Sequence, residues 1–177
     1  MLIYRHDVIV ERSVTVKFWK SLRFGRHCTI QAGVYIYGSR SGKVLDFGDY
    51  VVISHGCTLL GEAGFVIGDF THFGPRVVLT TQYGNSRSDP YQGDVVLSYS
   101  PVKVGRGCWI GAGSILMPGT ELGDGTIIAP NSVVFGLWGS KPGISLAGNP
   151  ARPIQGPRNA PARTGQSFKE GSRDDHR

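Results

Sequence analysis

Aliphatic residues recur at every sixth position between residues 104 and 134. They are Val104, Ile110, Leu116, Leu122, Ile128 and Val134. The fifth position of each unit is always small, and it is occupied by Cys108, Ser114, Thr120, Thr126 and Ser132. A strict period of six fits neither the 3.6-residue period of a helix nor the simple alternation of a strand. A fixed internal period is typical of solenoids, and a period of six predicts a β-helix.

Each unit of six is interpreted as one short strand followed by a tight corner. The aliphatic residue points inward and stacks on its counterpart in the next coil, and the small residue points inward beside the corner. Glycines such as Gly111 and Gly113 suit the corners, because glycine adopts positive φ without strain. Stacked coils pair backbone to backbone, so each coil covers the edge of the last. Turn-rich strands of a β-sandwich are the alternative, but the five uninterrupted units argue against it.

The pattern divides the chain into segments. Alternating apolar residues in 1–21 predict one or two strands that start or cap the solenoid, with Trp19 as part of the cap. The β-helix itself is predicted for 22–155. A long break at about 80–101 predicts a projecting loop, and loops of this length on a regular scaffold are usually functional. Residues 156–177 are rich in proline and small polar residues, which predicts a flexible tail without a stable helix.

Charge and cysteine content restrict the classes of ligand and the cellular compartment that we expect. The net charge of +6 is scattered, which fits an anionic cofactor or a nucleotide-sugar. No arginine-rich stripe with interleaved aromatic residues is present, so nucleic acid is not an expected partner. The chain has three cysteines, an odd number without paired spacing: Cys28, Cys57 and Cys108. We therefore expect them to be small buried core residues and not disulfide partners. A reducing compartment follows from this cysteine usage. The start of the chain has no signal-peptide layout and no run is long enough to span a membrane, so we expect a cytoplasmic protein without membrane insertion.

Two segments, 103–125 and 147–152, resemble the hexapeptide-repeat acyltransferases, and in particular the sugar, maltose and galactoside O- and N-acetyltransferases. The resemblance covers roughly residues 22–155. It implies an all-β fold, a left-handed parallel β-helix with one projecting loop. It also implies acetyl-CoA as cosubstrate, a sugar or nucleotide-linked sugar as acceptor, and a homotrimer with sites between subunits. The left hand is implied by the resemblance alone, because parallel crossovers are normally right-handed.

The resemblance also implies roles for particular positions. Ala112 and Gly113 would lie beside the pantetheine arm, and Pro130 and Asn131 would lie at the equivalent place one coil later. The guanidinium of Arg152 would bind CoA phosphates, for which its bidentate geometry is suited. The remaining implied contacts are Lys141 for phosphate and Trp109 for the wall of the acceptor pocket. Relatives often carry a Thr-Lys pair just after the repeats, where this chain has Phe135 and Gly136.

The catalytic histidine of the sugar O-acetyltransferases does not carry over. Those enzymes hold it in the projecting loop, but this chain has no histidine between His72 and His176. Gln82, Tyr83 or Gly84 occupies the expected place.

Three interpretations of this loss remain open. In the first, His55 or His72 is the general base, because a neutral imidazole takes a proton near pH 7. In the second, an amine acceptor needs no strong base, and Gln82, Tyr83 and Asn85 only orient the substrate. In the third, the solenoid is a non-catalytic scaffold or binding subunit.

A zinc site of the γ-carbonic anhydrase kind is a further possibility on this fold. It needs three converging histidines. Only His55 and His72 lie in the middle of the predicted solenoid, so no metal is expected. The preferred hypothesis is an acetyl-CoA-dependent acyltransferase of polysaccharide or glycoconjugate synthesis, with an amine acceptor slightly favoured over a hydroxyl.

Overall fold

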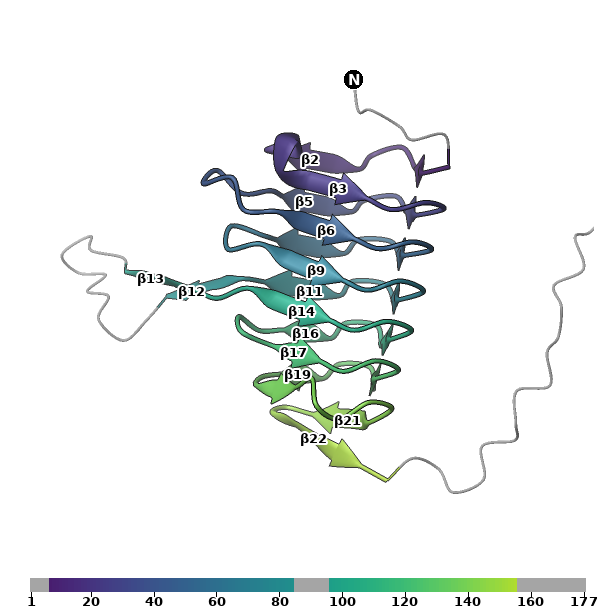
Figure 1. Cartoon of the computed structure of the whole chain (residues 1–177), viewed down its shortest axis with the longest axis vertical. Coiled ribbons are helices and arrows are strands. Elements are labelled where there is room, and N and C mark those ends of the chain that lie inside the picture. Colours follow the sequence, from purple (N-terminus) through teal and green to yellow (C-terminus); the bar gives the residue numbers. More distant parts are fainter. Residues whose placement is uncertain (1–6, 85–95, 156–177) are drawn as a thin grey trace, which may run out of the picture.

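The computed structural model describes residues 7–84 and 96–155, and these form a single parallel β-solenoid (Figure 1). Three short strands make up each coil, and six such coils stack along one axis. With the N-terminal coil at the top, the chain crosses the near face from left to right as it descends, so the coils wind left-handed. The predicted left-handed parallel β-helix is therefore confirmed.

Three sheets run the length of the solenoid, one on each side. In sheet A the order is β1 (Ile9–Val10), β4 (Thr29–Ile30), β7 (Val52–Ile53), β10 (His72–Phe73), β15 (Trp109–Ile110), β18 (Ile127–Ile128), β21 (Ser145–Gly148) and β22 (Ala151–Ile154). Sheet B contains β2 (Thr15–Lys17), β5 (Tyr35–Tyr37), β8 (Thr58–Leu60), β11 (Val78–Thr80), β16 (Ile115–Leu116) and β19 (Val133–Val134). Sheet C contains β3 (Leu22–Phe24), β6 (Leu45–Phe47), β9 (Phe65–Ile67), β14 (Val102–Val104), β17 (Glu121–Leu122) and β20 (Leu137–Trp138).

The core consists of the stacked inward residues that the period of six predicted. All six aliphatic positions of the repeat are buried, and so are the five small positions beside the corners. The hydroxyls among them bond to backbone carbonyls; Thr120, for example, donates to the carbonyl oxygen of Val134 at 3.0 Å. Cys28, Cys57 and Cys108 are buried and unpaired, as expected. Burial raises the pKa of the Cys57 thiol to about 11, so it stays protonated at neutral pH.

Winding starts before the predicted boundary at residue 22. Strand β1 pairs in parallel with β4, and β2 pairs in parallel with β5, so both belong to the first coil. One turn of 3-10 helix, η1 (Trp19–Ser21), joins sheet B to sheet C in this coil. The strands predicted for 1–21 therefore start the solenoid and do not form a separate cap.

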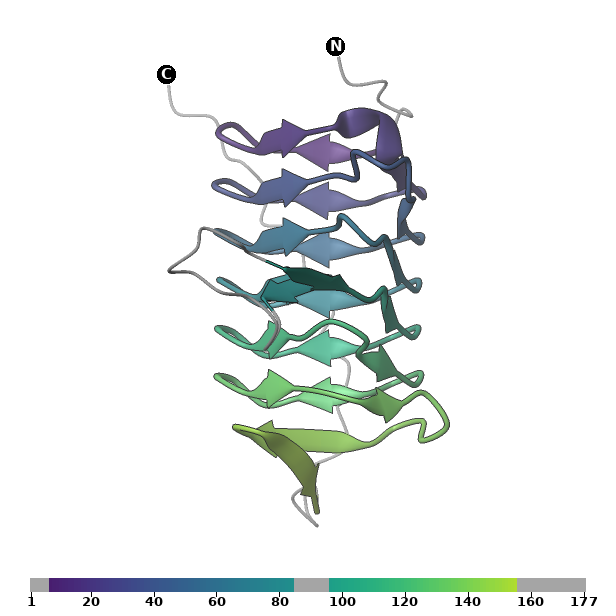
Figure 2. The same cartoon turned by 90° about the vertical axis from the view of Figure 1, so that its left-hand side faces the viewer.

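One segment leaves the stack between β11 and β14. Strands β12 (Gln82–Gly84) and β13 (Leu97–Tyr99) pair antiparallel and project sideways from the fourth coil (Figures 1 and 2). They lie within the predicted loop at 80–101, whose central part is outside the described residues. The predicted tail at 156–177 is also outside them. In the described part of the chain, no helix is long and apolar enough to cross a membrane.

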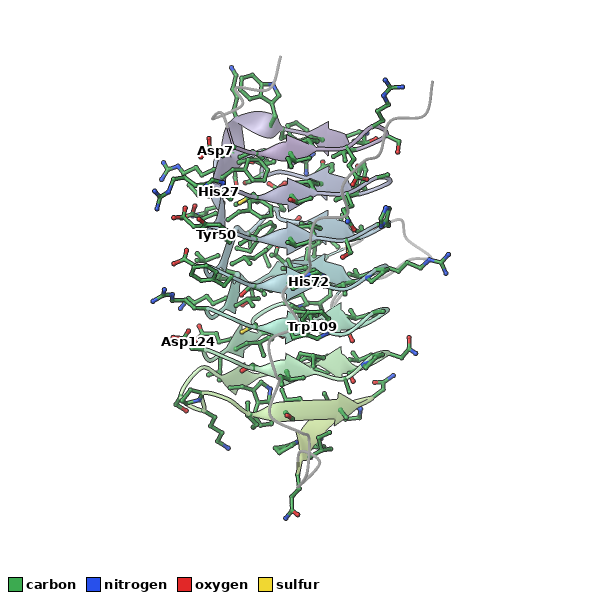
Figure 3. The ribbon with its side chains drawn as sticks, turned by 90° about the vertical axis from the view of Figure 1, so that its right-hand side faces the viewer. Asp7, His27, Tyr50, His72, Trp109 and Asp124 are labelled. Carbon is green, nitrogen blue, oxygen red and sulfur yellow. The ribbon has the colours of Figure 1, made fainter. Side chains whose placement is uncertain are left out.

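The corner between sheets C and A is held by stacked side chains. The rings of His27, Tyr50 and Phe70 stack with centroid distances of 4.7 and 5.0 Å, and Figure 3 shows the first two in line. The Asp49 carboxylate accepts the backbone N–H of Arg26 in the preceding coil at 2.8 Å. These contacts between coils help to fix the register of the stack.

Candidate functional site

The corners between sheets A and B form an open groove of about 660 Å³ along one edge of the solenoid. Five consecutive coils each contribute two corner residues to it. At the usual strand spacing of about 4.8 Å, the five corners span roughly 19 Å. The lining residues are Ala32, Gly33, His55, Gly56, Pro75, Arg76, Ala112, Gly113, Pro130 and Asn131.

Each of these corners turns through a residue with left-handed φ. Gly113 has φ of +69° and Asn131 has φ of +57°, and asparagine tolerates this region better than most residues. The N–H of Asn131 donates to the carbonyl oxygen of Ala112 at 2.9 Å, so the corners are tied to one another through the backbone. The groove floor is therefore regular backbone with small side chains, on which an extended ligand can lie closely.

His55 lies in this groove beside a fixed carboxylate. Its Nε2 is 3.7 Å from Oε2 of Glu11, and its side chain is 60% exposed. The same Glu11 oxygen accepts the backbone N–H of Ala32 at 2.8 Å, which holds the carboxylate in place. A carboxylate in this position orients the ring and stabilises the imidazolium that forms when histidine accepts a proton.

Among the described residues, Arg76 is the only lysine or arginine that lines the groove. It occupies the left-handed corner position of the fourth coil, with φ of +58°. Its N–H donates to the carbonyl oxygen of His55 at 2.9 Å, so its backbone lies next to that of His55, one coil further along the solenoid. A guanidinium here can bind the phosphate of a ligand that follows the groove.

His72 lies outside the groove, on the outer face of sheet A. Its ring stacks on Trp109 of the next coil, with 4.5 Å between centroids and 13° between planes (Figure 3). Its Nε2 is 3.2 Å from the hydroxyl oxygen of Ser54. Burial lowers the pKa of His72, so the ring is neutral and able to accept a proton at pH 7.

The two histidines lie on either side of one corner. Ser54 contacts His72, and its neighbour in the chain, His55, lines the groove. His55 and His72 are thus associated with the same corner but face different surfaces.

The other predicted positions are spread over the molecule. Ala112, Gly113, Pro130 and Asn131 line the groove together with His55. Lys141 lies at the corner between sheets C and A, with its Nζ 5.5 Å from the centroid of the Trp138 ring. Arg152 is exposed on β22 and donates to the carbonyl oxygen of Ala151 at 2.9 Å.

The predicted acceptor residues do not line the groove either. Gln82 and Tyr83 lie on the projecting strand β12, where Tyr83 is 47% exposed. Trp109 lies on the outer face of sheet A. Asn85 is outside the described residues. In a single chain, the described part of the groove therefore gathers the predicted pantetheine contacts and one histidine, but neither the predicted phosphate contacts nor the predicted acceptor contacts.

Three residues that line the groove or contact its histidines were not identified from the sequence, namely Glu11, Arg76 and Ser54. Glu11 follows β1 in the first coil and would have been recognised as a corner residue if the repeat had been extended to residue 9. Arg76 is a non-glycine residue at a left-handed corner, where its side chain points away from the core. Ser54 has no signal of its own, because its bond to His72 joins two coils. No group of three or more histidine, cysteine or acidic side chains among residues 7–84 and 96–155 is arranged to hold a metal.

Comparison with known families identifies the repeat. The profile of the family "Bacterial transferase hexapeptide (six repeats)" matches residues 101–136. Residues 101–136 therefore match the hexapeptide repeats of this family. Nodulation protein L of Rhizobium leguminosarum bv. viciae is 34% identical over 105 residues, which is 57% of this chain and 54% of that protein. The putative lipopolysaccharide biosynthesis O-acetyl transferase WbbJ of Escherichia coli K12 is 26% identical over 162 residues, covering 87% and 81%.

The chain spans about half the length of the curated relatives that it matches first. Solved structures share its fold. A mutant of AntD, an N-acyltransferase from Bacillus cereus, in complex with dTDP-4-amino-4,6-dideoxyglucose and coenzyme A, superposes with a TM-score of 0.75. The identity is 18%, and the match covers 87% of this chain and 83% of AntD. The acetyltransferase domain of PglB from Neisseria gonorrhoeae, in complex with acetyl coenzyme A, has a TM-score of 0.61 at 21% identity, covering 84% and 58%.

Proposed function

We propose that this protein transfers an acetyl group from acetyl-CoA to a sugar or nucleotide-linked sugar. The observation that carries the proposal is the groove between sheets A and B, which combines a floor of small corner residues with the His55–Glu11 pair and Arg76. The comparisons support it, because the relatives include named acetyltransferases and two neighbouring folds were solved with coenzyme A or acetyl-CoA.

The groove suits the extended arm of the cofactor. Its floor runs along the solenoid for roughly 19 Å at ~4.8 Å per coil, and the side chains of Ala32, Ala112 and the corner glycines leave room for a chain to lie on the backbone. Arg76 supplies a cation for the phosphates. Acetyl-CoA is the cosubstrate in this proposal, and Ala112, Gly113, Pro130 and Asn131 contact its pantetheine arm.

A homotrimer is part of the proposal. The groove is open on a single chain, and a second copy placed against it would supply the opposite wall. Lys141 and Arg152 lie away from the groove of their own chain, so we assign them to the phosphates of cofactor bound at a neighbouring copy. Closed cyclic symmetry would then create equivalent sites at every junction.

We assign His55 as the base, since it is the histidine in the groove and Glu11 orients it. The acceptor nitrogen or oxygen attacks the thioester carbonyl carbon, forming a C–N or C–O bond. The C–S bond breaks, and its electron pair leaves with the CoA sulfur. The acceptor proton passes to His55 Nδ1, the ring nitrogen that does not face Glu11, and then to the CoA thiolate. His72 is the alternative base, because it is neutral at pH 7.

An amine acceptor is slightly favoured over a hydroxyl. An uncharged amine is the better nucleophile and loses its proton late, so it places less demand on a base. Gln82, Tyr83 and Asn85 would orient the acceptor, and Trp109 would wall its pocket. We place the activity in polysaccharide or glycoconjugate synthesis in the cytoplasm, where acetyl-CoA is available.

The experiment is a thiol-release assay with acetyl-CoA and a panel of nucleotide-linked sugars, each tested as the amino sugar and as its hydroxyl counterpart. Release of CoA with an amino sugar, and less release with its counterpart, supports the proposal. Release with hydroxyl sugars alone would contradict the acceptor preference. A protein that binds acetyl-CoA but turns over no acceptor would favour the alternative of a non-catalytic binding subunit.

A further inference from the structure

A second pocket lies at the N-terminal end of the solenoid, on the corner between sheets B and C. The turn of the first coil, which contains η1, and the polar excursion at residues 38–44 of the second coil enclose a volume of about 750 Å³. Figure 2 shows both turns on the same edge of the stack, at its purple and blue end. The lining residues are Phe18, Trp19, Lys20, Ser21, Arg23, Ser39, Arg40, Gly42 and Val44.

Hydrogen bonds between the two turns fix the walls of this pocket. The Ser21 hydroxyl accepts the N–H of Ser39 at 3.0 Å and donates to the carbonyl oxygen of Phe18 at 2.9 Å. The N–H of Gly38 donates to the carbonyl oxygen of Lys17 at 2.8 Å. A Cβ at Gly38 would lie only 2.4 Å from the Phe18 oxygen, so only glycine permits this approach. The pocket is therefore formed by two interlocked turns.

The lining is cationic. Lys20, Arg23 and Arg40 line the pocket, and no acidic residue among those described does. Glu62 lies outside the lining and pairs with Arg40, with 3.7 Å between Arg40 Nε and Glu62 Oε2. Asp46 is the Cα partner of Arg23 on the neighbouring strand, but in the described structure no ion pair joins their side chains.

Within the described residues, Lys20 forms no ion pair. The pocket therefore carries an uncompensated positive charge even when Glu62 and Asp46 are counted. Clustered cations without acidic neighbours create a field that attracts anions.

Exposed aromatic rings stand beside these cations. Trp19 is 49% exposed, and Phe18 is 43% exposed although its ring packs edge-on against Tyr37 at 5.1 Å between centroids. Phe18 has φ of +56°, a conformation that bulky residues rarely adopt, so the turn presents these rings at a conformational cost. An indole next to cations can stack on a planar group attached to an anion.

We propose that this pocket binds a phosphate-bearing ligand. Its phosphates contact Lys20, Arg23 and Arg40, and its planar or apolar portion packs on Trp19. A volume of about 750 Å³ lies in the range of ordinary small-molecule sites. The phosphate can come from a free nucleoside diphosphate or from the headgroup of an anionic lipid. This site lies on a different corner from the acyl-donor groove, so the proposal does not depend on acyl transfer.

The test uses the full chain with three probes. Calorimetry measures binding of uridine diphosphate and of inorganic pyrophosphate, and co-sedimentation measures binding to phosphatidylglycerol vesicles against phosphatidylcholine vesicles. The double variant Lys20→Ser, Arg40→Ser should weaken binding at least roughly tenfold, because charge-assisted hydrogen bonds are lost. Lys17→Ser is the matched control, since Lys17 is exposed on β2 but does not line the pocket.

The outcomes separate the two sources of phosphate. Nucleotide binding that Trp19→Ala weakens, with pyrophosphate bound more loosely, assigns the site to a free nucleotide. Binding to phosphatidylglycerol vesicles alone, again lost in the double variant, assigns it to a lipid headgroup. No binding of any probe at millimolar concentration overturns the proposal, as does binding that the double variant retains or that saturating acetyl-CoA abolishes. Failure to bind acetyl-CoA would count against the proposed function and leave this site unaffected.

Discussion

The imidazole of His72 stacks on the indole of Trp109, with 4.5 Å between ring centroids and 13° between their planes. The two residues are Cα partners on β10 and β15, so the stacking of coils brings together side chains that are far apart in sequence. The indole covers one face of the imidazole and helps to remove it from water. Burial lowers the pKa of His72, which lies on the outer face of sheet A as a partly buried imidazole that is neutral at pH 7.

Replacing Trp109 by alanine should raise the pKa of His72 towards its ordinary value of about 6.5. Burial is the cause of the lowered pKa, and the substitution would expose the ring. Titration of the His72 ring protons by NMR measures the change. Leu137→Ala removes an exposed apolar side chain from sheet C and should leave the titration unchanged. An unchanged pKa in Trp109→Ala would mean that another group buries the ring.

The lowered pKa of His72 predicts a pH dependence of stability. Its folded-state pKa lies below the unfolded value, so the folded protein binds fewer protons than the unfolded chain as pH falls. The contribution of the neutral ring is fully present above about pH 6.5 and is lost as pH falls towards the folded-state pKa. Urea denaturation of wild type and His72→Gln at pH 7.5 and at lower pH measures it. Equal pH slopes for the two proteins would contradict the prediction.

His55→Ala should lower turnover by roughly 10²-fold or more, which is the scale of a general base. Acetyl-CoA affinity should change little, since the groove floor is backbone. Glu11→Gln should cause a smaller loss, because it removes the carboxylate that stabilises the imidazolium while keeping a side chain of similar size. Steady-state kinetics separates kcat from KM. If His72→Ala reduces kcat more than His55→Ala does, the roles of the two histidines are exchanged.

Arg76→Gln should weaken CoA binding by about 1–3 kcal/mol, the scale of a hydrogen bond to a charged group. Arg152→Ala should cost a similar amount if this residue reaches the phosphates from a neighbouring copy. Arg106→Gln removes a guanidinium from the corner between sheets C and A and serves as the control. Titrations of each variant with coenzyme A and with its dephosphorylated form would locate the contact. A loss for Arg152 alone would place the phosphates away from Arg76.

The fold could be predicted from sequence because each core position repeats. The positions of Val104 and Cys108 recur in every unit of six. This period predicts an inward aliphatic side chain on each strand and a small inward side chain beside each corner. The same regularity placed Ala112 and Asn131 at equivalent corners, and the structure brings both into one groove. The floor of that groove is therefore predictable from the six-residue period of the chain.

Contacts between coils could not be predicted in the same way. The pair of His55 with Glu11 needs the first coil to begin at residue 9, but the sequence left open whether the strands there start or cap the solenoid. The bond between Ser54 and His72 and the stacking on Trp109 depend on how adjacent coils align across interruptions in the repeat. Lys141 was predicted beside the cofactor but packs near Trp138, on another corner of its own chain.

The central claim is that the groove between sheets A and B binds the acyl donor. Calorimetric titration of the purified protein with acetyl-CoA tests it most directly, together with the same titration of Gly113→Trp, which places a large side chain on the groove floor. Wild type should bind at micromolar to sub-millimolar strength, and the variant should fail to bind while keeping its circular dichroism spectrum. Absence of binding by wild type at millimolar acetyl-CoA, or equal binding by the two proteins, would contradict the account.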